Sequence, residues 1–149
     1  MRGFLLCTLL VAIAFAFGFA KDETVDELKS RFESAHPEDR AELAIHIARL
    51  QLDNADKLYV SGNVDQANAA VIEVVTYSEK AGDAAKQTNK RLKNIEIDVR
   101  KIADKLRDIK RTLAFDDQPP LEQAIRRLED LRTSLLEEMF AKDKSKEKK

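Results

Sequence analysis

The sequence predicts an all-α protein, and three observations carry this prediction. The 149 residues include only four Gly and three Pro, so few positions interrupt a helix. Ala, Leu, Glu, Lys and Arg, which favour helices, are abundant. Apolar or small residues recur over residues 64–113 at alternating steps of three and four. We therefore expect an antiparallel four-helix arrangement around one long coiled-coil-like helix at about residues 64–114, preceded by a signal peptide.

Residues 1–20 have the composition of a secretory signal peptide. Arg2 supplies a positive start, residues 4–19 form an uncharged apolar run, and small residues precede a cleavage position after Ala20. The run is shorter than the ~20 residues that span a bilayer, which favours cleavage over retention as an anchor. Cleavage removes Cys7, so the exported chain has no cysteine for disulfides, thiolate catalysis or metal ligation. We expect a periplasmic or secreted protein.

Two helices are predicted before the long one. The first covers about residues 22–35 and ends because Pro37 pushes the preceding residue out of the helical region. The second runs over about residues 37–59, with Pro37 in its first turn, where a missing N–H costs nothing. Gly62 is expected to end this helix in the left-handed conformation, and Asn63 to cap the next.

A heptad stripe defines the long helix. Its members continue without a slip and are Val64, Ala67, Val71, Val74, Ser78, Ala81, Ala85, Thr88, Leu92, Ile95, Val99, Ile102, Leu106, Ile109 and Leu113. Gly82 lies inside this run, so a chain reversal at Gly82-Asp83 is the alternative to one continuous helix. The unbroken phase favours a single helix of about 50 residues, roughly 75 Å long.

The end of the chain contains one more predicted helix and a charged tail. After Pro119-Pro120, apolar residues at helical spacing predict a helix over about 121–140, folded back antiparallel along residues 92–113. The helical bundle domain is therefore expected to cover residues 21–141. Residues 142–149 contain no apolar side chain and are predicted to form a disordered Lys-rich tail.

The sequence offers little material for catalysis. Its two histidines are His36, three residues after Glu33, and His46, one turn after Glu42. Di-iron bundles use the Glu-x-x-His spacing twice, with further carboxylates, whereas here it occurs once and ends at a helix break. The Glu42–His46 spacing is typical of an exposed pair on a helix. We expect no enzyme activity, no cofactor and no metal.

A segment around the predicted Gly62-Asn63 turn resembles a tetratricopeptide-type helical hairpin, over about residues 48–80. Leu58-Tyr59, the Gly-Asn turn and Ala67 stand where that repeat places its packing residues. The resemblance implies a helical hairpin and a protein-binding surface, which in that superfamily takes about three repeats to build. The chain contains one copy, and a helix–turn–helix corner with a glycine cap accounts for the same pattern.

Basic residues concentrate in residues 90–111, which hold nine bases and four acids. Four that lie off the stripe, Lys93, Arg100, Arg107 and Arg111, are candidates for contact with an anionic surface such as lipid headgroups or cell-wall polymer. The alternative is a solvated helix face, since coiled coils carry such charges in any case. Nucleic acid is not expected, because aromatic residues are few and an export signal is present.

Two function hypotheses remain after these exclusions. The first is a non-enzymatic exported protein with a structural or protein-interaction role, as a scaffold or chaperone-like protein of the cell envelope. Ile97, an apolar residue away from the heptad stripe, is the candidate contact for a protein partner or a second copy. The second hypothesis is anionic-surface binding through the basic residues at 90–111.

Overall fold

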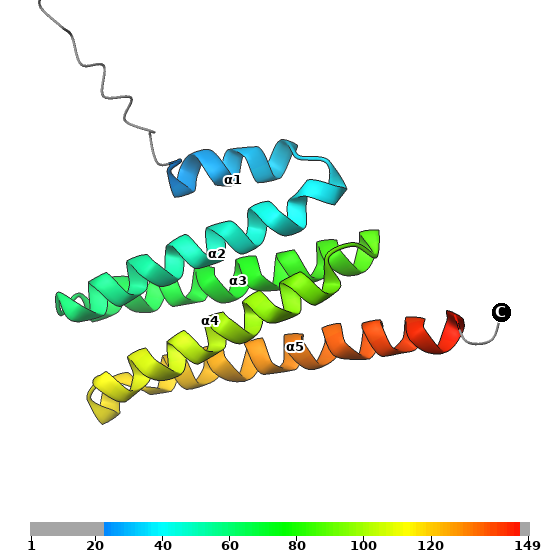
Figure 1. Ribbon diagram of the computed structural model, residues 1–149. Coiled ribbons are helices and arrows are strands. Elements are labelled where there is room, and N and C mark those ends of the chain that lie inside the picture. Colours follow the sequence, from blue (N-terminus) through cyan, green and yellow to red (C-terminus); the bar gives the residue numbers. More distant parts are fainter. Residues whose placement is uncertain (1–22, 147–149) are drawn as a thin grey trace, which may run out of the picture.

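The computed structural model describes residues 23–146, and these fold into five α-helices and one 3₁₀ turn (Figure 1). The elements are α1 Val25–Ser34, α2 Pro37–Val60, α3 Val64–Thr88, α4 Leu92–Thr112, η1 Phe115–Asp117 and α5 Pro119–Lys146. The prediction of an all-α protein is confirmed for this part of the chain. The predicted signal peptide, with Cys7 and the cleavage position at Ala20, lies outside the described residues.

The helix starts follow from local chemistry. Thr24 and Glu27 form a capping box at α1, in which each side chain accepts a hydrogen bond from the other's backbone N–H. Pro37 occupies the first turn of α2 as predicted, and Gly62 ends that helix at a φ of 79°. Asn63 precedes α3, but its amide donates to Ser61 and does not cap the helix, so this detail of the prediction is wrong.

The prediction of one long helix over residues 64–114 is wrong, because the chain reverses between α3 and α4. Asn89 and Arg91 both adopt the left-handed conformation, with φ of 60° and 63°, and α4 runs back in the opposite direction (Figure 1). The heptad spacing is nevertheless unbroken in the sequence, because the three loop residues, 89–91, occupy positions of the heptad at which a polar residue is expected. Thr88 and Leu92 therefore keep a spacing of four residues on either side of the turn.

Gly82 is not the site of the reversal, since α3 continues through it to Thr88. Leu131 of α5 packs over Gly82, and a Cβ atom at this position would lie only 2.6 Å from Leu131 Cδ1. The neighbouring stripe residues Ser78, Ala81 and Ala85 are buried and equally small. Small side chains on α3 thus allow α5 to approach closely, which explains a glycine inside a helix.

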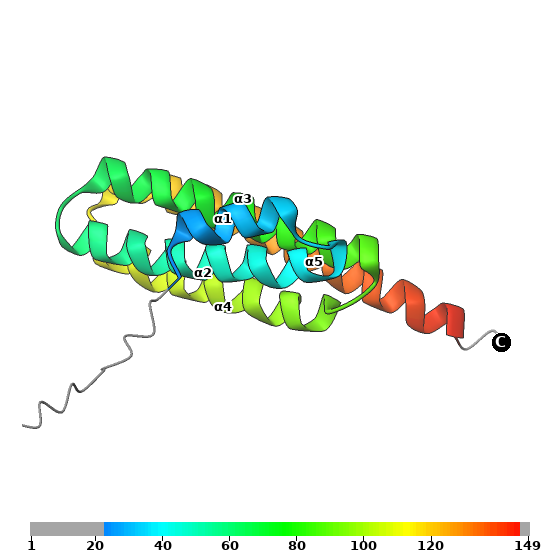
Figure 2. The same ribbon diagram turned by 90° about the horizontal axis from the view of Figure 1, so that it is seen from above.

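The helices share one hydrophobic core. α2 packs against α3, α3 against α5, and α5 against α4, while α1 lies on α2 (Figures 1 and 2). Consecutive helices run in opposite directions, so the α2–α3 turn and the α4–α5 turn lie at one end of the bundle. Members of the predicted stripe are buried in both halves, among them Val74, Val99, Ile102 and Leu106.

The last helix is longer than the sequence indicated. α5 continues to Lys146, past the predicted end near residue 140, and thus includes the first part of the Lys-rich segment 142–149. Ala141 and the three Lys residues of this extension favour helices, which accounts for it. Residues 147–149 lie outside the described residues. The end of α5 projects past the α3–α4 turn, away from the rest of the bundle (Figures 1 and 2).

The left-handed residue at the start of α4 leads to a stability prediction. Arg91→Gly is expected to raise the free energy of unfolding by about 1 kcal/mol, because glycine adopts positive φ without the steric cost that a Cβ imposes. Arg91→Ala keeps that cost and loses the same ion pair to Glu42, so it is the matched control. Urea unfolding should rank the Gly variant above the Ala variant. An Ala variant of equal stability would contradict this account of Arg91.

Candidate functional site

The four predicted basic residues all lie on α4 but fall into two pairs. Lys93 and Arg100 are exposed, and neither forms an ion pair within the described part of the chain. Arg107 is half-buried and contacts Asp104 at 2.6 Å and Glu129 of α5 at 2.5 Å. The structure thus leaves only the first pair available for an external anion.

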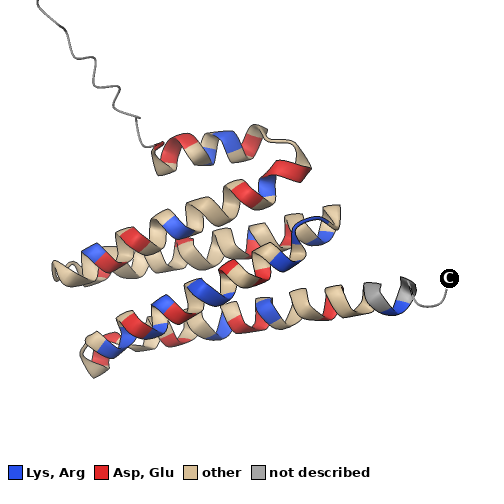
Figure 3. Ribbon diagram, viewed as in Figure 1, with Lys and Arg blue, Asp and Glu red and all other residues tan. Residues whose placement is uncertain are grey.

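Ion pairs join α2 to the α3–α4 turn and to α4. Three of them are Lys90–Glu38 at 2.7 Å, Arg91–Glu42 at 2.7 Å and Lys105–Asp56 at 2.6 Å. In the fourth pair the base, Arg49, is on α2 and the acid, Asp98, is on α4. The Lys90 ammonium lowers the pKa of Glu38, and the hydrogen bond from Lys105 to Asp56 raises the pKa of the lysine. Acids of α2, which lie roughly 50 residues earlier in the chain, therefore balance two bases of the α3–α4 turn and one base of α4 (Figure 3).

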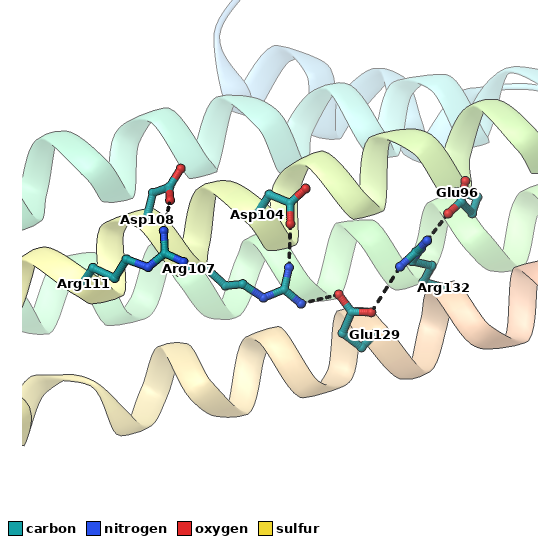
Figure 4. A network of polar contacts seen from close by, with 7 residues as sticks. All are labelled: Glu96, Asp104, Arg107, Asp108, Arg111, Glu129 and Arg132. Atoms are coloured by element: carbon teal, nitrogen blue, oxygen red, sulfur yellow. Dashed lines mark hydrogen bonds and ion pairs between the residues drawn. The ribbon is translucent and has the colours of Figure 1, made fainter.

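A second network joins α4 to α5 and is drawn in Figure 4. Glu129 receives Arg107 on one carboxylate oxygen and Arg132 on the other, at 2.5 Å and 3.6 Å. Arg132 also donates to Glu96 at 2.6 Å, and Glu96 is nearly buried. The hydrogen bond to Glu129 raises the pKa of Arg107, so this guanidinium remains charged. The network holds two helices together and offers no free cation.

Arg111 contacts Asp108 one turn earlier on the same helix, at 2.9 Å (Figure 4). Both side chains are exposed, and pairs of this kind are typical of a solvated helix face. For Arg107 and Arg111, the structure therefore favours the alternative that these charges serve the helix and its neighbours.

Ile97, the candidate partner contact, lies on α4 between Lys93 and Arg100 in the sequence. It is half-buried and lines a groove of about 560 Å³ between α2 and α4, together with Leu50, Asn94 and Asp98. Two ion pairs lie in this groove, Arg49–Asp98 and Arg91–Glu42. Leu50 and Ile97 are its half-buried apolar side chains, within charged surroundings.

The two histidines are not part of a catalytic or metal-binding cluster among the described residues. His36 precedes α2, and His46 lies two to three turns further along that helix; both are exposed. Glu33 and Glu42 are also exposed, and Glu42 pairs with Arg91. Within residues 23–146, no group of three or more His, Cys, Asp or Glu side chains has the geometry to hold a metal ion.

The structure exposes large apolar side chains that the sequence reasoning did not single out. Val60 is 85% exposed in the α2–α3 corner, and Phe115 is 84% exposed in the α4–α5 turn. The two turns lie at the same end of the bundle (Figure 1). Phe140 near the end of α5 and Ile72 on α3 are the other large exposed apolar residues of the described chain. In the sequence, only their positions at the predicted turns indicated that Val60 and Phe115 would be exposed.

Tyr59 anchors this end of the bundle and has an altered proton affinity. Its hydroxyl donates to Asn68 Oδ1 at 2.6 Å across the α2–α3 turn. Burial, with a smaller contribution from Asp117, raises the pKa of Tyr59 from 10.0 to about 12. Burial also raises the pKa of Tyr77.

This shift predicts a loss of stability in alkali. Between pH 10 and about 12 the folded protein keeps the Tyr59 proton while the unfolded chain releases it, so the free energy of unfolding falls as pH rises. Tyr59→Phe should flatten this part of the stability profile, measured by urea unfolding at a series of pH values. The absorbance of tyrosinate should show that Tyr59 ionises at a higher pH than a free phenol does. Ionisation near pH 10 in the native protein would contradict the assigned burial.

The fold and its surface define a class: over the described residues, an all-helical protein in which many charges are paired internally and Val60, Phe115 and Phe140 are exposed in turns or near helix ends. Comparisons with protein-family models, with curated proteins and with solved structures give no significant match for this chain. Among the described helices, none is both long enough and apolar enough to cross a membrane.

Proposed function

We propose that this is a non-enzymatic exported protein that binds other proteins, as a scaffold or chaperone-like component of the cell envelope. The observation that carries the proposal is the exposure of two large apolar side chains, Val60 and Phe115, in the two turns at one end of the bundle. Apolar surface that a fold leaves exposed is typical of interaction sites. Every buried side-chain nitrogen and oxygen of the described residues has a hydrogen-bond partner, so the bundle interior holds no polar site awaiting a ligand.

Two features of the sequence support the same role. Residues 1–20 have the composition of a signal peptide, which supplies the export. Val60 lies at the corner of the α2–α3 hairpin, the segment that resembles a tetratricopeptide repeat, a superfamily of protein-binding folds. Mass spectrometry of the native protein tests the first feature directly, since cleavage leaves a chain that begins near Lys21 and lacks Cys7.

A capture experiment with matched variants tests the binding surface. The purified protein is immobilised and exposed to an envelope extract of its native source. The double variant Val60→Asp/Phe115→Asp is expected to lose a partner that the wild type retains. The control Ser61→Asp/Ala114→Asp adds the same charges to neighbouring exposed positions and should keep that partner. Equal recovery by both variants would exclude this end as the binding surface, and circular dichroism verifies that both fold.

One observation favours a second candidate function, contact with an anionic surface. Lys93, Arg100 and Lys101 are exposed on α4 without ion pairs in the described chain, and Ile97 lies among them. Cations beside an apolar side chain suit a layer of anionic lipid headgroups. The contribution is electrostatic, so added salt should weaken it.

Sedimentation with phosphatidylglycerol vesicles separates this function from protein binding. Lys93→Gln/Arg100→Gln is expected to abolish vesicle binding, because these cations have no internal partner. Arg107→Gln/Arg111→Gln removes equal charge from residues that are already paired and should bind nearly as the wild type does. Wild-type protein that stays in the supernatant would exclude the anionic-surface function.

A further inference from the structure

The end of α5 projects from the bundle and exposes one large apolar side chain, Phe140. α5 has 28 residues and α4 has 21, and both helices meet at the same turn, so α5 extends beyond α4 by about 10 Å. Phe140 on this projecting segment is 63% exposed, and Leu136 and Met139 are half-buried beside it. Figures 1 and 2 both show the segment projecting from the bundle.

An apolar groove lies toward the other end of the same bundle. α3 and α5 form its walls, and its volume is about 540 Å³. Its apolar lining consists of Val71, Ile72, Val75, Pro119, Pro120 and Ala124. Ile72 is 63% exposed at this groove, although it is a large aliphatic residue. Arg127 on the rim is already paired with Glu79, so the groove has no free charge to attract a small ion.

We propose that the projecting end of α5 of one molecule docks into the α3–α5 groove of a second copy of this chain. This inference rests on the proposed function of protein binding and names one partner for it. Phe140 is the anchor, because a large exposed aromatic side chain gains most from an apolar groove. Phe140 lies about 25 Å along α5 from Gln123 in the groove, so a molecule cannot fill its own groove.

Charge complementarity identifies the occupant as a second copy. In the sequence, residues 142–149 follow closely after Phe140 and contain five Lys against one Asp and one Glu. Three acids lie close in the chain to residues that line the groove: Asp65 is three residues before Asn68, and Asp116 and Asp117 are separated from Pro119 by Gln118. None of the three forms an ion pair within residues 23–146. The basic segment therefore has an acidic surface to meet beside the groove that accepts Phe140.

The contact joins two different surfaces and is thus head-to-tail. Each molecule in such a pair keeps one free groove and one free helix end, so further copies can add. A contact between two helix ends is the symmetric alternative, but it leaves the groove and its acidic flank uncovered.

Analytical ultracentrifugation of the purified protein tests the proposal. The wild type is expected to form larger species as concentration rises. Phe140→Glu and Ile72→Glu are each expected to weaken association by about tenfold or more, since each removes one side of the contact. Both side chains are exposed, so neither substitution disturbs the core. Gln87→Glu is the control: it adds the same charge at an exposed position of α3 outside the groove lining and should leave association unchanged.

Mixing the two variants gives the decisive result. Phe140→Glu keeps an intact groove and Ile72→Glu an intact helix end, so the mixture is expected to form a two-molecule complex and nothing larger. Wild-type protein that remains monomeric at every concentration would overturn the proposal. Association that is sensitive to Phe140→Glu but not to Ile72→Glu would overturn it as well, since two helix ends would then pair. Partner capture through Val60 and Phe115 is a separate measurement, so failure of either idea is recognisable.

Discussion

Ile102→Ala is expected to lower the free energy of unfolding by about 2–5 kcal/mol. Ile102 is 2% exposed on α4 and belongs to the core shared by α2, α3, α4 and α5. Truncation removes three methyl or methylene groups and leaves a cavity that the close-packed helices fill only in part. Equilibrium unfolding in urea, followed by circular dichroism, gives this free energy.

Ile72→Ala is the matched control for this prediction. It removes the same atoms from the same residue type on a neighbouring helix, but Ile72 is 63% exposed. The expected change is within about 0.5 kcal/mol, as for most surface substitutions. Similar losses for the two variants would show that α4 does not pack as described.

Gly82→Leu is expected to cost about 1–3 kcal/mol, although leucine is a far better helix former than glycine. The helix propensity favours the variant, whereas the new side chain must displace Leu131, whose Cδ1 would lie 2.6 Å from an added Cβ. The steric effect wins because Leu131 is buried and its neighbours are close-packed. Thermal and urea unfolding both report the loss.

A second substitution isolates the steric cause. In a Leu131→Ala background, Gly82→Ala has room for its Cβ, and its helix propensity should raise stability by about 1 kcal/mol. In the wild-type background the same Gly82→Ala should be neutral or destabilising. A stabilising effect in both backgrounds would show that α5 does not approach α3 at this position.

Helix type and the buried stripe were predictable from the sequence, because periodicity records which face of each segment is apolar. The predicted residues Val74, Val99 and Leu106 are all buried. The α3–α4 reversal was not predictable in the same way. Asn89 and Arg91 lie at polar positions of the heptad, and a three-residue turn there leaves the apolar spacing unchanged. Gly82 was the predicted alternative position for a reversal, because glycine destabilises a helix, but a glycine in a helix also permits close packing.

The sequence predicts an excess of positive charge on residues 90–111, but it does not show which of the bases are free to contact an anionic surface. The excess of bases at residues 90–111 is visible in the sequence, but their partners belong to distant helices. Lys105 pairs with Asp56, and Arg107 with Glu129, across about 50 and 22 residues of chain. Only the packing of α2 and α5 against α4 separates these paired residues from Lys93 and Arg100. The contribution of Ile97 to any binding stays a prediction.

The sequence by itself determined that most of residues 25–140 are helical, where several of the helices begin, and which face of each is buried. These properties depend on local sterics, on capping and on a spacing of three and four residues, all of which can be read from neighbouring positions. Tertiary structure alone decided the reversal at residues 89–91, the pairing of the charges on α4, and the exposure of Phe115 and Phe140. The reason is that direction, ion pairing and exposure depend on which segments lie side by side, and residues distant in sequence settle that through close packing.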